Sequence, residues 1–311
     1  MVLLVQRLSR SLKPSFKLEN HHHHHHHHHG QEVFSASLHA FEDEISKGLL
    51  QLSLQSKPSS EILTLPWIRQ CLQLLPTTKK AFAKLVADID YPISSWELAS
   101  VEGYLADSLR LLELLNSITS CLSHLAQARM AISHALSLME DSPAAAMERL
   151  KAIRSFDFNK NHKHGEENED NGQERYCSGK DWIIHQALAM IKSVVFSLCG
   201  VVAVSLCGDV QACLEIRKAA GEFGNFSLIS SDLKVCEEII KSGSMLREVR
   251  DVNEGVGQLI VAIGSGQSSN AEKELQRRVE VLGKLLEGVG EEVDQLFSEV
   301  LMGRNDLLNS L

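Results

Sequence analysis

The sequence has few of the residues that interrupt helices. Six prolines in 311 residues leave room for long helices, and aromatic residues make up only 5% of the chain. Leu, Ala, Glu, Lys and Gln, which favour helices, are frequent instead. No segment carries a strand pattern. We therefore expect an all-α protein, an elongated multi-helix bundle with long antiparallel helices.

Excess positive charge is also lacking, since the formal net charge is −9. Broad binding to a nucleic-acid backbone needs a basic face, so no nucleic-acid partner is expected. The seven cysteines form no C-x-x-C pair, and several lie in apolar stretches. This pattern is typical of buried free thiols in a reducing compartment and not of a disulfide framework.

The motifs of catalysis and cofactor binding are missing. There is no H-E-x-x-H, no phosphate-binding G-x-x-x-x-G-K-[ST] and no G-x-S-x-G turn. Nine consecutive histidines, His21–His29, would bind zinc or nickel in vitro, but a lasting metal site needs fixed geometry. We therefore predict no catalytic residue, no metal site and no cofactor, and interpret the protein as a non-enzyme.

Composition divides the chain into four parts. Residues 1–30 form a leader with the histidine run, and 31–155 form an N-terminal helical part. Residues 156–178 are acidic and lack aliphatic side chains, which predicts a disordered linker. Residues 179–311 form a C-terminal helical part, expected to pack on the first. The leader is basic near its start, which is compatible with plastid targeting; otherwise we expect a cytoplasmic or membrane-associated protein.

Helix boundaries follow from turn and cap residues. Residues 57–60 end a first helix, Ser60 is a candidate cap for the next, and Pro76 predicts a kink or break in it. Ser94 or Ser95 is expected to cap a long helix that starts at Trp96. Residues 141–143 end that helix and begin a shorter one. Two further helices are expected over 210–263.

The most apolar segment is Trp182–Cys207, which includes fifteen consecutive uncharged residues. A membrane-spanning helix needs about twenty such residues, and Lys192 could not easily reach the membrane surface from mid-span. Two interpretations stay open: a central bundle helix and a spanning or re-entrant membrane segment. The candidate membrane residues are Ile183, Val194, Val195, Phe196, Val201, Val202 and Leu206.

The last helix carries an apolar seam with alternating spacings of four and three residues, typical of a coiled coil. This seam predicts packing within the bundle or, as the alternative, contact with a partner, including self-association through the C-terminal helix. Its residues are Leu275, Val279, Leu282, Leu286, Val289, Val293, Leu296 and Val300.

Four segments together resemble the BYPASS family of plant proteins. Leu63–Trp67 and Leu85–Trp96 look like the family's leucine-rich box and the turn that follows it, and Tyr104–Asn116 and Leu301–Leu308 also look like family segments. The resemblance covers about 33–145 and 180–311. It implies a helical protein without known catalytic residues, linked to root and shoot development through restraint of a mobile root-derived signal.

We therefore expect a plant regulatory protein that acts through protein–protein contacts with partners the sequence does not name. Two alternatives stay open. One is a membrane-associated helical adaptor, because a related plant group is linked to exocyst binding. The other is an enzyme that acts on a small hydrophobic signal precursor.

Overall fold

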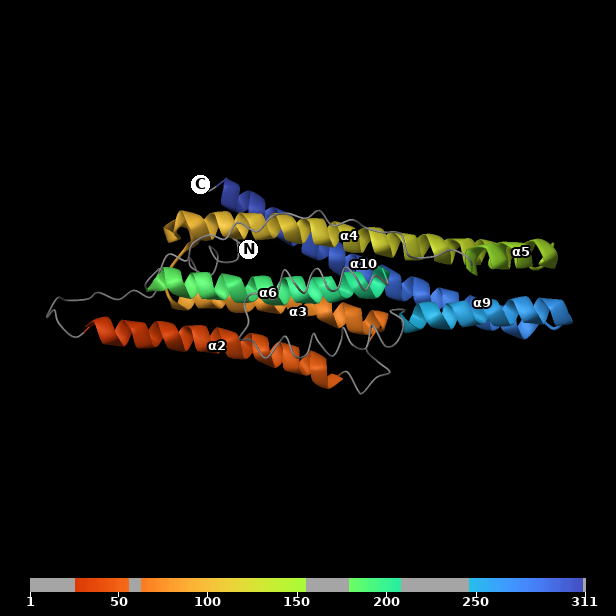
Figure 1. Ribbon diagram of the computed structural model, residues 1–311, viewed down its shortest axis with the longest axis horizontal. Coiled ribbons are helices and arrows are strands. Elements are labelled where there is room, and N and C mark those ends of the chain that lie inside the picture. The colour runs from red at the N-terminus through yellow and green to blue at the C-terminus, as the bar shows by residue number, and fades with distance from the viewer. Residues whose placement is uncertain (1–25, 56–62, 155–178, 208–245, 310–311) are drawn as a thin grey trace.

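The computed structural model describes residues 26–55, 63–154, 179–207 and 246–309, and these form an all-α protein. They contain seven α-helices, one 3₁₀ helix and no strand, which confirms the predicted fold class. Figure 1 shows an elongated bundle with most helices aligned along its long axis. The predicted disorder of the leader and linker lies largely outside the described residues, as do most of the helices expected over 210–263. The domain division stays a prediction.

The first half of the chain forms an antiparallel set of helices. α2 spans His26–Gln55, α3 Leu65–Asp88, α4 Leu98–Ser137 and α5 Pro143–Arg154. α2 thus begins inside the histidine run, five residues before the predicted boundary. α2 packs closely on α3 at Gly48, where an added Cβ atom would lie too close to the Leu74 Cδ1 methyl and the Leu74 side chain would have to shift.

The second half supplies α6, Lys180–Cys207, α9, Arg247–Ser265, and α10, Ser269–Leu308. α6 packs against α2, α3 and α4, while α10 packs against α3, α4 and α9. α4 and α10, forty residues each, run antiparallel over roughly 60 Å (Figure 1). The long central helix predicted from the sequence is confirmed.

The observed helix starts differ from the predicted ones. α3 is capped by Thr64, whose side chain accepts a hydrogen bond from the Trp67 amide at 3.3 Å; the proposed cap Ser60 lies outside the described residues. α3 also continues through Pro76 without a break. Before α4, Ile93–Ser95 form the 3₁₀ helix and Glu97 is the N-cap, so neither Ser94 nor Ser95 caps α4.

Both ends of α3 are bonded to the second half of the chain. The Arg247 amide donates to the Leu63 carbonyl at 3.0 Å, and the Lys180 ammonium donates to the Asp90 carbonyl at 3.0 Å. Leu63 and Asp90 have φ angles of 68° and 46°, a region that residues other than glycine seldom adopt. These strained residues are therefore fixed by contacts distant in sequence.

Further contacts strengthen the same two junctions. The Glu248 carboxylate accepts from the Leu65 amide at 3.2 Å, so α9 helps to cap α3. The Tyr91 hydroxyl donates to the Asp181 carboxylate at 2.7 Å. The pKa of Tyr91 is raised to about 12, mainly by partial burial and next by this hydrogen bond. The junctions tie the start of α6 and of α9 to the ends of α3.

One core joins the helices of both halves. Phe82 of α3 is fully buried between Phe41 of α2 and Trp96, with edge-to-face ring centroids 6.3 and 5.9 Å apart. Cys71 and Cys199 are buried thiols, and burial raises the pKa of Cys199 to about 12. Cys121, by contrast, takes part in a disulfide, which corrects the expectation of free thiols for that residue.

Phe82→Ala should lower the free energy of unfolding by about 3–5 kcal/mol, because it removes both edge-to-face contacts and leaves a cavity. Met130→Ala on the exposed face of α4, where the side chain is 62% exposed, should change it by less than about 0.5 kcal/mol. Denaturant unfolding followed by circular dichroism measures both. Equal effects of the two substitutions would contradict this description of the core.

Candidate functional site

The candidate membrane segment lies in the interior of the bundle. α6 is the one helix among the described residues that is long and apolar enough to cross a membrane, and 61% of its most apolar window is buried within the molecule. Of the candidate membrane residues, Val195 and Phe196 are half-buried and the other five are buried. A core helix of a soluble bundle meets the same criteria as a spanning helix, so this finding is weak evidence for a membrane.

The predicted seam of α10 is likewise turned into the bundle. Its first seven residues are buried and Val300 is half-buried. α10 packs on α3, α4 and α9, in agreement with the interpretation that the seam packs within the bundle. Self-association through these side chains would require the helices to separate, and it stays a prediction.

Histidines do not form a shared site in the described part of the chain. His134 of α4 contacts Arg149 of α5, with 2.8 Å between Nδ1 and Nη1. Nowhere in the described ranges do three or more His, Cys, Asp or Glu side chains gather as they would around a metal ion. The side chains of the nine-histidine run fall outside what the structure describes.

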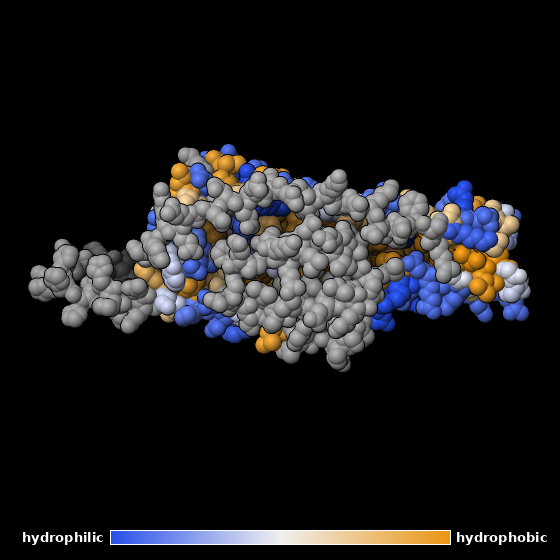
Figure 2. All heavy atoms as spheres, viewed as in Figure 1, coloured by the Kyte–Doolittle hydropathy of each residue, from blue (hydrophilic) through white to orange (hydrophobic). Residues whose placement is uncertain are grey.

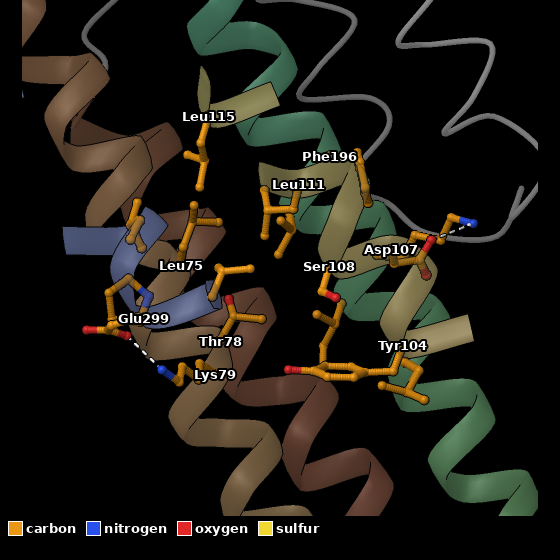
Figure 3. Close-up of a pocket in the computed structure, with 17 residues that line it drawn as sticks. Leu75, Thr78, Lys79, Tyr104, Asp107, Ser108, Leu111, Leu115, Phe196 and Glu299 are labelled. Atoms are coloured by element: carbon orange, nitrogen blue, oxygen red, sulfur yellow. Dashed lines mark hydrogen bonds and ion pairs between the residues drawn. The ribbon is translucent and has the colours of Figure 1, made fainter. Parts of the chain in front are cut away.

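A small apolar pocket lies where four helices meet (Figure 3). It has a volume of about 100 Å³ and is partly open to solvent. Its walls are mainly aliphatic, with Leu75 from α3, Leu111 from α4, Ile191 and Phe196 from α6, and Leu296 from α10. Hydrophobic pockets between bundle helices are common ligand sites, so we take this four-helix pocket as the candidate functional site.

Two ion pairs flank the pocket. Lys79 of α3 bonds Glu299 of α10 at 2.7 Å, and Lys192 of α6 lies 3.2 Å from Asp107 of α4. These four side chains are 19–32% exposed. Partial burial opposes ionisation of Glu299, but hydrogen bonds from Lys79 and Gln295 outweigh it and lower the pKa of that carboxyl. The pocket therefore carries charges of both signs that neutralise each other.

Hydroxyl groups provide the remaining polarity. Ser108 donates to the Leu105 carbonyl at 2.8 Å and accepts from Arg304 at 3.0 Å, while Thr78 donates to the Leu74 carbonyl at 3.1 Å. Tyr104 extends from α4 along the pocket toward the side of Thr78 and Lys79 (Figure 3). Burial raises the pKa of Tyr104 to about 12, although nearby Arg304 opposes the shift. The phenol therefore stays protonated at neutral pH.

Four residues of this pocket were candidate site residues in the sequence analysis, although the pocket itself was not predicted. Val195 and Phe196 were candidate membrane residues, and Leu296 and Val300 were seam residues. The structure brings the two sets together around one hollow. Tyr104 and the two ion pairs were missed, because each partner is an ordinary helix residue whose neighbour lies far away in the sequence.

Comparison with known proteins finds similarity to plant proteins. Protein BPS1, chloroplastic, of Arabidopsis thaliana is 26% identical over 300 residues, which cover 88% of this chain and 83% of the relative. UPF0496 protein 4 of Oryza sativa, from subspecies indica and japonica alike, is 30% identical over 115 residues. Over most of its length the chain is therefore similar to BPS1. This confirms the resemblance inferred from the four sequence segments.

The rice similarity is local, since it covers 37% of this chain and 25% of each rice protein. No family model matches the chain. No solved structure matches it either, so the bundle described above has no experimental counterpart among these comparisons.

Leu286→Ala should lower the free energy of unfolding by about 2–5 kcal/mol without changing the oligomeric state, because the seam is core in the single chain. Val281→Ala, at an exposed position of the same helix, is the matched control and should have little effect on either. Chemical unfolding and analytical ultracentrifugation measure the two properties. Dissociation of an oligomer with unchanged stability would instead support a partner seam.

Glu299→Gln should lower the free energy of unfolding by about 1 kcal/mol at neutral pH, because it removes the ion pair with Lys79. The folded pKa of Glu299 lies below the ordinary value of 4.5, so this contribution is present above pH 4.5 and is lost as the pH falls through the folded pKa. The difference between wild type and variant should therefore shrink in acid. Unfolding measured at pH 7 and pH 3 tests this, with Glu291→Gln on the exposed face as control. A difference that stays constant would contradict it.

Proposed function

We propose that this chain is a non-catalytic regulatory protein of plant development that acts through protein–protein contacts and restrains production of a mobile root-derived signal. The similarity to Arabidopsis BPS1 over most of both chains is the observation that carries this proposal. The pocket supports a non-catalytic role, because its four charged residues are bound in ion pairs within the chain. This pairing makes the alternative of an enzyme less well supported.

An exposed apolar surface offers a place for such contacts. Several large apolar side chains are exposed on the first part of α4 and the last part of α10, which pack antiparallel. Figure 2 shows hydrophobic surface at that end of the molecule, and we call this the α4/α10 patch. Contiguous exposed apolar surface often marks a protein contact. Its residues are Leu98, Leu109, Leu301, Met302 and Leu308.

Complementation of a plant that lacks this protein tests the proposal. Leu301→Glu combined with Met302→Glu should leave accumulation and thermal stability nearly unchanged, because both side chains are already exposed, and should abolish rescue of development. Val261→Glu is the matched control, since Val261 is 73% exposed on α9 and should retain rescue. Full rescue by the double variant would contradict a contact role for the patch. Turnover of a metabolite by the purified protein would contradict the non-catalytic role.

The compartment belongs to the same proposal. The Arabidopsis relative is named chloroplastic, and the basic leader of this chain is compatible with plastid targeting. A fluorescent fusion of the full chain should therefore accumulate in plastids, and removal of residues 1–30 should leave it in the cytosol. Identical distributions of the two fusions would count against targeting by the leader.

Membrane association is the second candidate, favoured by the length and apolarity of α6. Extraction of plant membranes at alkaline carbonate pH separates the two candidates. Release of the protein into the soluble fraction supports the bundle-core role of α6. Retention in the pellet supports a spanning helix.

A further inference from the structure

We propose that the four-helix pocket binds a neutral, mainly apolar molecule of about single-ring size that carries one hydrogen-bond acceptor. This site goes beyond the proposed regulatory role, because it does not depend on any protein partner. Three properties of the pocket define the ligand: its size and apolar walls, its paired charges and its one available hydroxyl donor.

The walls and the size favour a small apolar group. Leucine, isoleucine and phenylalanine side chains from all four helices face the hollow, so a polar ligand would lose hydration without replacement. The volume of about 100 Å³ can be compared with an engineered cavity of about 150 Å³ that takes up benzene. Because the pocket is partly open, a ring can lie inside it while the substituent of that ring stays at the mouth. A complete lipid chain is too large.

The ion pairs favour a neutral ligand. Each of the charged side chains that line the pocket has a partner of opposite sign within the pocket, Lys79 with Glu299 and Lys192 with Asp107. An anionic or cationic ligand would have to break one of these pairs and leave a half-buried charge without its partner. Separating such a pair costs free energy, so the site discriminates against charged molecules of the same shape.

The phenol of Tyr104 supplies the polar contact. Ser108 and Thr78 already use their hydroxyl protons for backbone carbonyls, whereas the Tyr104 hydroxyl donates to no other residue in the described part of the chain. A phenol is protonated at neutral pH, and burial raises the pKa of this one further above its ordinary value of 10.0. A ligand carbonyl, ether or hydroxyl oxygen would accept this hydrogen bond, and the bond would orient the ring against the aliphatic walls.

Fluorine NMR on the full-length protein tests the proposal with two probes of similar shape, 4-fluoroacetophenone and 4-fluorobenzoate. The neutral ketone should bind saturably, and the carboxylate should bind at least tenfold more weakly. Tyr104→Phe keeps the ring but removes the donor, and it should weaken ketone binding by about two- to tenfold. Met130→Ala, far from the pocket walls, is the control and should bind as wild type.

Two substitutions that fill the hollow provide independent checks. Leu111→Phe and Val195→Phe add volume from α4 and from α6, and each should abolish ketone binding while circular dichroism shows an unchanged helix content. If one of them fails to fold, the other makes the same test. The proposal is overturned if the ketone does not bind the wild type, if both folded filling variants bind it normally, or if the carboxylate binds as tightly as the ketone.

Discussion

The position of α3 depends on two residues whose backbone conformation is costly for any amino acid but glycine. Leu63 precedes the helix and Asp90 follows it, and each has a positive φ angle that costs on the order of 1–3 kcal/mol. The carbonyl of each accepts a hydrogen bond from the second half of the chain, from the Arg247 amide and the Lys180 ammonium. α3 in turn provides Phe82 to the core and Leu75, Thr78 and Lys79 to the pocket. The packing of the core and the shape of the pocket therefore both depend on these two junctions.

The helices themselves could be predicted, because their signals are local. An apolar side chain every three or four residues identifies α4 and α10 wherever they pack, and the long predicted helices are present. Helix ends were less predictable. Thr64 acts together with Glu248 from α9 at the start of α3, and Glu97 stands where a serine cap was expected before α4. At Pro76, buried residues on both sides, including Leu72 and Phe82, hold the helix together despite the lost backbone hydrogen bond.

The pocket could not be predicted, for a different physical reason. Its side chains come from four helices, and each one taken alone is an ordinary member of an apolar stripe or a charged face. Lys79 and Glu299 are separated by 220 positions, and Lys192 pairs with Asp107 of another helix. The sequence did mark Val195, Phe196, Leu296 and Val300 as apolar, with packing in the bundle, a membrane or a partner as the open interpretations, but it did not place them together. Only the packing of α6 and α10 against α3 and α4 turns them toward the same space.

The two junctions at α3 also set an order of events while the chain is synthesised. The hydrogen bond from the Leu65 amide to the Glu248 carboxylate cannot form until Glu248, 183 positions later, has been synthesised. At a translation rate of 5–20 residues per second, this delay is roughly 10–40 s. During that time α4 and then α6 are made, but α10 does not yet exist, so the faces of α3 and α4 that pack on it are still uncovered. Newly made chains should therefore be clients of chaperones until the last helix emerges.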